Sequence, residues 1–575
     1  MNIALQKKGT LSTYEFLFDQ LKSWGVTSYS GVTGGGVIHF LKHLSPLQHP
    51  STEEPSFFTV SEYVAGFIPL GYFLASGKIA AAVATTGAAT KLLTCGLSDA
   101  KLHNIPSVYI VPITNTDSIG FSALQDTSIY GSNMVEQLKA ELPDSVFVLD
   151  NRFNMPEQLT LAKRQLDCSK PVVLVLDNTA LNGEVSDIFP LSEEHLSEHA
   201  TDFSTFIATL REACFGKHLT ILVGEEMARY DNGADLTSSL SESLKATTVW
   251  TINGANAVSS SNPYGFGYIS FGGNDRAIEA FKALGQDDVL LLLGACPDEY
   301  TTNLSRIHAS ETFFVNGIAD AYGLVGNSLQ HMVDGVYHQV QGPLDAFVNA
   351  LIMDAENVPF PNVPAAIAPF NLNTKPIPKP RAGYVDMADL FLRLNARWPQ
   401  ETIAFDDVCL AYKDRQYVTQ RPNENARFFS LYRGSAMGGA FGAAIGAKMA
   451  KPNATTVLFT GDGCFRLFAG SLGEVSSLGL VVFLLNNETL SIVEQGLQQL
   501  LPDTPDDHYH ARVTRINYCQ LAEACHWEAV KLQSDLSNLD DILAKIGEGK
   551  NRSLLIEVPV DPLQVLGNNP RLNNL

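Results

Sequence analysis

Cysteine is scarce in this chain and shows no metal-binding pattern. Only 8 of the 575 residues are cysteine, and none of them forms a CxxC motif. Zinc sites and small disulfide-bonded scaffolds both carry cysteines at short, regular spacings. We therefore expect a fold built on a hydrophobic core, in a reducing, cytoplasmic compartment.

Positive charge is also scarce. The chain has 39 Lys and Arg against 61 Asp and Glu, which gives a formal net charge of −22. Nucleic acids and anionic membranes attract basic surfaces, so the charge argues against both as partners. The sequence has no apolar run of membrane-spanning length, and its first residues, MNIALQKKGT, do not resemble a secretory signal.

The most informative pattern lies between Thr455 and Gln495. An apolar run ends at Gly461-Asp462-Gly463, apolar residues at helical spacing follow, and a second run at 480–485 ends at two asparagines. In a βαβ unit the two strands are parallel, and their carboxyl ends share one edge of the sheet. We therefore expect Asp462 and Asn487 to lie side by side.

The residue types at this edge predict a site for a phosphate and a cation. Glycines let a backbone approach a bulky group, and the amino end of a following helix suits a phosphate. A carboxylate and a carboxamide together suit Mg²⁺ bridging to phosphate oxygens. The alternative is an ordinary turn in which Asp462 caps the helix.

The GDG and NN motifs, which together span 27 residues, resemble the signature of thiamine-diphosphate (ThDP) enzymes of the acetolactate-synthase and 2-oxo-acid-decarboxylase type. The resemblance implies that Asp462, Asn487 and the carbonyl of Thr489 hold Mg²⁺. It also implies that Gly463 and Cys464 contact the diphosphate, where relatives commonly carry a small Ser or Ala in place of Cys464.

A long apolar helix beginning at Glu62 matches the family's glutamate helix with its Gly-Tyr and Gly-Lys end. An acid at a helix start also has a structural explanation in the helix dipole. The resemblance implies that Glu62 is catalytic: it hydrogen-bonds the cofactor's pyrimidine and favours loss of the thiazolium proton. Met437 is expected to support the bent cofactor, with Ser435 and Ile492 near it. A methionine in a core is otherwise an ordinary gap filler.

The substrate pocket implied by the resemblance includes Gly35, Gln125 and Val493. Gly35 follows a predicted strand, and Gln125 ends a loop that resembles the family's active-site loop. Either residue could equally belong to an ordinary turn. Val493 stands where simple decarboxylases carry a glutamate, which removes a proton donor.

The expected reaction follows from this departure. The family decarboxylates a 2-oxo acid, and a carbanion with no acid nearby can attack a second carbonyl acceptor. We therefore expect an acetolactate-synthase-like carboligase. Alternatives are a simple decarboxylase that releases an aldehyde, a non-catalytic ThDP-fold protein, and an oxidoreductase, although no GxGxxG follows a strand.

The fold class is α/β, with three doubly wound parallel-sheet domains: two outer ThDP-binding-fold domains, which look like copies of one unit, and a central Rossmann-like domain. The predicted pyrimidine-binding domain covers 1–185, the central domain 200–355 and the diphosphate-binding domain 380–562. An extended linker spans 356–379, and a loose tail spans 563–575.

The resemblance places the active site between subunits, so that Glu62 and Asp462 come from different chains of a homodimer or homotetramer. The central segment ACPDEYTT lacks the arginines expected of a flavin site. Therefore FAD is not expected.

Overall fold

The computed structural model describes residues 11–47, 54–151, 153–182, 184–185, 201–321, 328–548 and 551–574. The chain divides into two compact units, residues 1–198 with 445–452 and residues 199–444 with 453–575. Three parallel sheets with covering helices form its three α/β domains, which confirms the predicted fold class. Among the described residues no helix is both long and apolar enough to cross a membrane.

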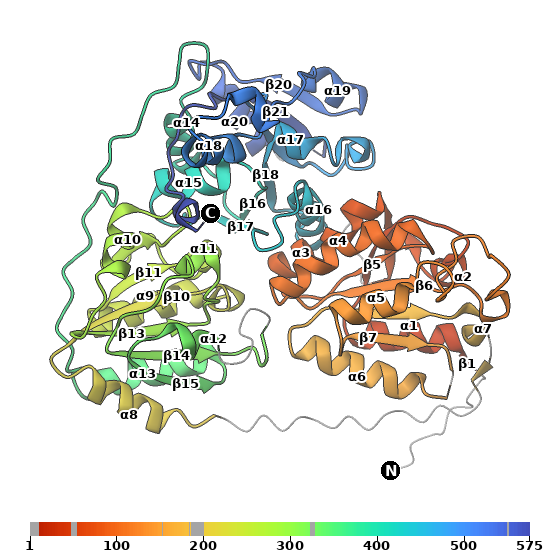
Figure 1. The fold of residues 1–575 in the computed structure, drawn as a ribbon, viewed down its shortest axis with the longest axis horizontal. Coiled ribbons are helices and arrows are strands. Elements are labelled where there is room, and N and C mark those ends of the chain that lie inside the picture. The colour runs from red at the N-terminus through yellow and green to blue at the C-terminus, as the bar shows by residue number, and fades with distance from the viewer. Residues whose placement is uncertain are drawn as a thin grey trace. The chain divides into compact units, whose positions relative to one another are not determined.

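The first sheet lies in the first unit and has seven parallel strands (Figure 1). Their spatial order is β3 (Ser45–Pro46), β4 (Ser56–Thr59), β2 (Ser28–Gly31), β5 (Ala81–Val83), β6 (Val108–Pro112), β8 (Val172–Leu176) and β7 (Val146–Leu149). The helices of this domain are α1 (Thr13–Ser23), α2 (Ile38–Leu41), α3 (Glu62–Ser76), α4 (Ala88–Leu102), α5 (Met134–Glu141), α6 (Met155–Asp167) and α7 (Asn178–Leu181). A short antiparallel pair joins β1 (Leu11–Ser12) to β9 (Glu184–Val185).

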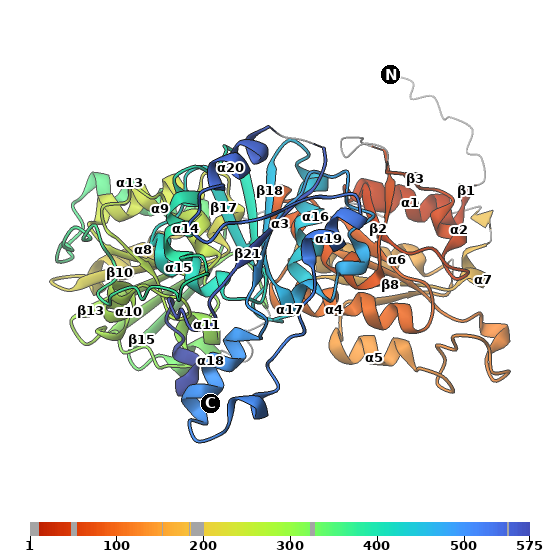
Figure 2. The ribbon, with the colours of Figure 1, turned by 90° about the horizontal axis from the view of Figure 1, so that it is seen from above.

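The first helix begins as the sequence predicts. The Ser12 side chain accepts a hydrogen bond from the Glu15 backbone N–H, and the Glu15 carboxylate accepts one from the Ser12 N–H. Gly25, with φ of +79°, follows the helix end. Figure 2 shows α1 and α2 on one side of the first sheet and α4 and α5 on the other, as expected for a doubly wound domain.

The central sheet has six parallel strands in the order β12 (Gly265–Tyr268), β11 (Thr247–Trp250), β10 (His218–Val223), β13 (Asp288–Leu293), β14 (Glu311–Asn316) and β15 (Val336–Gln341). In chain order this is 3-2-1-4-5-6, the Rossmann arrangement that the sequence predicts. Its helices are α8 (Ser204–Ala213), α9 (Gly233–Leu244), α10 (Asp275–Lys282), α11 (Glu299–Thr302), α12 (Ser328–Met332) and α13 (Leu344–Asn357). The predicted domain bounds leave 186–199 between the first and central domains, and these residues lie outside the described part of the chain.

The third sheet has the order β17 (Ala426–Ser430), β16 (Thr402–Asp406), β18 (Thr455–Gly461), β19 (Val481–Asn486), β21 (Leu554–Pro559) and β20 (Glu528–Lys531). Its helices are α14 (Met387–Asn395), α15 (Ala411–Thr419), α16 (Gly439–Ala450), α17 (Asp462–Phe465), α18 (Ser491–Leu500), α19 (Tyr518–Ala524) and α20 (Leu539–Gly547). In chain order the strands run 2-1-3-4-6-5. The first sheet without its edge strand β3 has the same order, as expected of two copies of one unit.

The predicted linker and tail lie against the rest of the second unit. Helix α13 runs to Asn357, and no helix or strand follows until Met387. The carboxylate of Asp275 accepts hydrogen bonds from the Thr374 and Lys375 N–H groups, at 2.8 and 3.1 Å, which fixes the linker.

The expectation of a loose C-terminal tail is wrong. The Gly567 N–H donates to Asp414 at 2.9 Å, and the Asn568 side chain donates to the Gly273 carbonyl at 2.8 Å. Farther along, Arg571 pairs with Glu299 at 3.1 Å. Polar, asparagine-rich segments look mobile in sequence, but here the side chains bond to the domains that flank the tail.

Candidate functional site

The edge of the third sheet brings together the two motifs that the sequence predicts to meet. Strands β18 and β19 are parallel, with Gly461 opposite Leu485. The buried Asp462 accepts one hydrogen bond from the Gly463 N–H and another from the Glu488 N–H, both at 3.0 Å. Since Glu488 directly follows Asn487, the predicted proximity of Asp462 and Asn487 is confirmed.

The long helix expected after this edge does not form. Helix α17 ends at Phe465, and only turns and a short 3₁₀ segment, Ala469–Ser471, precede β19. Gly470 and Gly473 lie in this segment, and glycine disfavours a helix interior by about 1 kcal/mol relative to alanine. A phosphate here would meet the glycine backbone of one short turn, not the amino end of a long helix.

The glycines of the GDG motif lie against neighbouring side chains. A Cβ on Gly463 would lie 2.6 Å from Cδ2 of Leu490 and 3.4 Å from Cε of Met437, and one on Gly461 would lie 3.2 Å from Cβ of Cys409. Any larger residue at 463 would intrude into the space beside Met437. The motif thus forms a narrow cradle, in which a side chain at 463 would displace Leu490.

A cavity of about 110 Å³ lies over this cradle. Its lining brings together most of the residues that the sequence predicts to bind the cofactor or the metal, and one predicted substrate-pocket residue, Val493: Met437, Asp462, Gly463, Cys464, Asn487, Thr489, Ile492 and Val493. Ser435 is not part of the lining; it has φ of +49° and its hydroxyl donates to the Tyr432 carbonyl at 2.6 Å. Leu490 and Ser491, which also line the cavity, carry no motif that would reveal them in sequence.

The cavity's polar atoms fit a hard cation. Asp462 supplies a carboxylate, Asn487 an amide oxygen that accepts the Thr489 N–H at 3.2 Å, and Thr489 a backbone carbonyl. Burial raises the pKa of Asp462 to about 6, partly offset by its two backbone hydrogen bonds. Since the described residues hold no cluster of three His, Cys, Asp or Glu side chains, a metal here needs amide, carbonyl and phosphate oxygens as well, which is typical of Mg²⁺.

Asp407 links three segments of the chain around the cavity, a role that the sequence does not reveal. Its Oδ1 accepts the Val408 and Gly438 N–H groups at 2.8 and 3.0 Å, and its Oδ2 accepts the Thr460 hydroxyl at 2.8 Å. These donors belong to the turn after β16, the turn before α16 and the end of β18. Burial raises the pKa of Asp407 to about 6, with these hydrogen bonds opposing the shift.

Asp407→Asn is expected to stabilise the apo-protein at alkaline pH. The folded state holds the Asp407 proton more tightly than the unfolded chain, because the pKa rises from 3.8 to about 6. The wild type therefore loses stability as pH rises through this range, by on the order of 2–3 kcal/mol, and the amide does not. Unfolding in urea at pH 4 and pH 8 measures the difference. Exposed Asp541→Asn is the control, and a pH-independent difference for Asp407→Asn would contradict the assignment.

Ile492 and Val493 open helix α18 at the rim of the same cavity. Val493 is 49% exposed. The neighbouring Glu494 does not line the cavity; its Oε2 accepts the Thr489 hydroxyl at 2.8 Å. An apolar side chain therefore faces the cavity at this rim, and the neighbouring carboxylate of Glu494 is already hydrogen-bonded.

In the first unit, Glu62 is the first residue of helix α3 and is partly exposed. Within the glycine run after β2, a Cβ on Gly34 would come within 2.6 Å of Thr85, and one on Gly36 within 2.7 Å of Pro112. Gly35 would meet nothing within 4 Å. Gly35 therefore has open space beside it, as a substrate-facing position requires.

Gln125 lies in a strained turn near the same edge. Its φ is +57°, and its side-chain oxygen accepts the Thr86 hydroxyl at 2.8 Å. Gly87 leaves room for it, because a Cβ there would lie 2.9 Å from Cβ of Gln125. The glutamine is exposed but held in place, and Thr86 rather than Gln125 lines the adjoining pocket.

Two family models match this chain, one over the region of Glu62 and one over the region of the GDG motif. Residues 11–140 match "Thiamine pyrophosphate enzyme, N-terminal TPP binding domain", and residues 414–558 match "Thiamine pyrophosphate enzyme, C-terminal TPP binding domain". They contain Glu62 and the GDG cradle respectively. The chain therefore belongs to the thiamine-diphosphate-dependent enzymes.

Individual relatives agree with this family. The chain is 24% identical to acetolactate synthase isozyme 2 large subunit of Escherichia coli (strain K12), with 84% of each chain covered. It is 23% identical to the isozyme 1 large subunit of that organism, over 97% of this chain and 96% of that one. Its fold is similar to that of the Rhodococcus jostii RHA1 thiamine diphosphate-dependent 4-hydroxybenzoylformate decarboxylase, with a TM-score of 0.72, 17% identity and 96% and 99% of the two chains covered.

Proposed function

We propose that this chain is a ThDP- and Mg²⁺-dependent enzyme that decarboxylates a 2-oxo acid and transfers the remaining acyl unit to a second carbonyl compound. When bound, the cofactor supplies the electron sink for decarboxylation. Glu62 holds the pyrimidine, and the cradle at Asp462 and Gly463 holds the diphosphate. Asp462, Asn487 and the Thr489 carbonyl bind Mg²⁺.

The apolar rim of the cavity favours acyl transfer over aldehyde release. An aldehyde forms when an acid delivers a proton to the reacting carbon. Val493 offers no proton, and the carboxylate of Glu494 is bonded to Thr489. With no acid at this position, a second carbonyl compound has time to react.

The test is CO₂ release from a panel of 2-oxo acids, with and without ThDP and Mg²⁺, followed by product analysis. Activity that needs both cofactors and yields an acyloin or a 2-hydroxy-2-acyl acid supports the proposal. An aldehyde as the sole product would favour a simple decarboxylase. His39 gives that second function some support, because its imidazole lines the same pocket as Gly35. Absence of ThDP binding by calorimetry would leave a non-catalytic member of the family.

Val493→Glu is expected to shift the products toward aldehyde by about tenfold or more, because it places a proton donor at the cavity rim. The position is half exposed, so the longer side chain has room. Chromatography of the product mixture measures the ratio. Val493→Gln is the matched control, since it has the same size without an acidic proton. Equal ratios for the two variants would show that the rim does not decide the outcome.

We propose that two subunits share each active site, with Glu62 from one chain and Asp462 from the other, in a homodimer or homotetramer. Light scattering during size-exclusion chromatography measures the mass. A monomer that turns over substrate would refute the shared site.

The eight cysteines are all free, which supports a cytoplasmic location, because extracellular proteins commonly pair theirs.

We also propose that the central domain does not use FAD. Ligands of Rossmann domains bind where the strand order reverses, here between β10 and β13. Glu226, just after β10, is buried there and accepts the Gly317 N–H at 2.7 Å and the Ile318 N–H at 3.3 Å. The chain's own carboxylate thus occupies backbone donors that could otherwise bind a nucleotide phosphate. An absorption spectrum of the purified protein without a flavin band would agree.

A further inference from the structure

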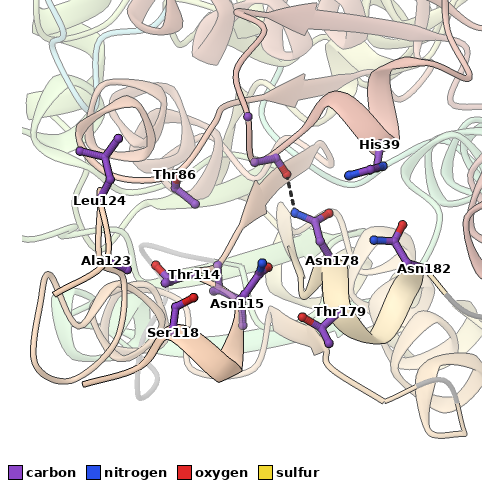
Figure 3. Close-up of a pocket in the computed structure, with 13 residues that line it drawn as sticks. His39, Thr86, Thr114, Asn115, Ser118, Ala123, Leu124, Asn178, Thr179 and Asn182 are labelled. Atoms are coloured by element: carbon purple, nitrogen blue, oxygen red, sulfur yellow. Dashed lines mark hydrogen bonds between the residues drawn. The ribbon is translucent and has the colours of Figure 1, made fainter. Parts of the chain in front are cut away.

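A second, larger cavity lies within the first unit, at the carboxyl edge of its sheet (Figure 3). Its volume is about 520 Å³, within the range of small-molecule sites. The lining residues are Gly35, Gly36, His39, Thr86, Ile113, Thr114, Asn115, Ser118, Ala123, Leu124, Asn178, Thr179 and Asn182. This set contains amides and hydroxyls but no Asp, Glu, Lys or Arg, and His39 is its only titratable residue.

Hydrogen bonds from residues at the end of β8 hold the cavity walls in place. The Asn178 amide donates to the Gly36 carbonyl at 2.8 Å, which joins this strand end to the glycine turn after β2. Asp177 lies behind the cavity, and its Oδ2 accepts the Thr116 hydroxyl at 3.0 Å. Its Oδ1 accepts the Thr179 N–H at 2.9 Å. Both carboxylate oxygens are engaged, so the walls are fixed and the cavity presents no free charge.

The loop after β6 is fixed as well. The Thr114 N–H donates to the Thr127 hydroxyl at 2.8 Å, and the Thr127 N–H donates to the Thr114 hydroxyl at 3.0 Å. This reciprocal pair sets the course of the loop that carries Asn115 and Ser118. A pre-formed wall lowers the entropy lost when a ligand binds.

Five polar side chains around the cavity have no hydrogen-bond partner among the described residues: His39, Asn115, Ser118, Thr179 and Asn182. They come from α2, the loop after β6, helix α7 and the residue that follows α7, and Figure 3 shows them around one opening. Amides and hydroxyls both donate and accept hydrogen bonds. The cavity therefore offers a mixed set of hydrogen-bond donors and acceptors on rigid walls.

We propose that this cavity binds an uncharged small molecule that carries several hydroxyl groups. An anion would find no Lys or Arg in the lining and would face Asp177 behind it, and a cation would find no free carboxylate. An apolar ligand would strip water from the amides without replacing their hydrogen bonds. A polyhydroxy compound can satisfy donors and acceptors together.

This binding does not depend on the proposed function, but Gly35 connects the two, since it lines the cavity and is a predicted substrate-pocket residue. The ligand is either a hydroxylated carbonyl acceptor or an effector without a carbonyl. Ligand-observed NMR on the full-length protein distinguishes these sources. Erythrulose and dihydroxyacetone keep an open-chain carbonyl in dilute solution, erythritol, xylitol and myo-inositol have none, and succinate and cyclohexanol serve as charged and apolar comparisons.

The proposal expects at least one polyhydroxy compound to bind, and Asn115→Leu with Asn182→Leu to weaken it about tenfold, as the loss of one or two neutral hydrogen bonds does. Asn349→Leu, an exposed amide on α13, is expected to bind like the wild type. Binding of the alditols would indicate an effector, and binding of the ketoses alone an acceptor. Failure of every polyhydroxy compound to bind, or unchanged binding by the double variant, would overturn the proposal. ThDP calorimetry on the same samples tests the proposed function separately.

Discussion

Glu62→Gln is expected to reduce ThDP-dependent CO₂ release by about 100-fold or more, within the range for loss of a general acid–base contribution. The carboxylate is at the first turn of α3 and is partly exposed within its own chain. A glutamine keeps the size and a hydrogen-bonding oxygen but cannot hold a proton on the pyrimidine ring. Initial rates of CO₂ release at saturating ThDP and Mg²⁺ measure the effect.

The structural explanation for Glu62 makes a different prediction. If the only role of Glu62 is a favourable interaction with the helix dipole, its replacement costs at most about 1 kcal/mol of stability and leaves the rate of CO₂ release unchanged. Glu157 is a matched control, because it is an exposed acid in the first turn of α6, in the same domain. Equal activities for Glu62→Gln and Glu157→Gln would remove Glu62 from the catalytic residues.

The sequence predicts the parts of this site that depend on backbone and strand order. Parallel strands bring their carboxyl ends together, so the meeting of Asp462 with the 487–488 loop follows from two apolar runs and a glycine turn. The regular spacing of the apolar residues after Asp462 does not reveal that α17 ends at Phe465.

Side-chain partners that come from distant segments are harder to predict. Asp407 is one acid in an unremarkable turn, and its role depends on Gly438 and Thr460 arriving from elsewhere in the chain. The same holds for Glu494, which could have faced the cavity from its place on α18. Only the contact with Thr489 decides that its carboxylate is engaged.

Asp462→Asn is expected to weaken Mg²⁺-dependent ThDP binding by about 100-fold. Two unit charges 4 Å apart attract by about 4 kcal/mol at an effective dielectric constant of 20, and tenfold in affinity corresponds to about 1.4 kcal/mol. Part of this attraction is offset by the cost of burying the carboxylate. Calorimetric titration of ThDP at fixed Mg²⁺ measures the change, with exposed Asp541→Asn as the control.

The apo-fold of this variant is expected to survive, because asparagine retains one oxygen for the Gly463 and Glu488 N–H groups that Asp462 now serves with two. Circular dichroism and melting without cofactor separate this outcome from misfolding. If Asp462 were only a helix cap, as the short α17 permits, the variant would lose stability and keep its Mg²⁺-dependent affinity. A folded variant with weak, Mg²⁺-independent ThDP binding therefore distinguishes the metal ligand from the cap.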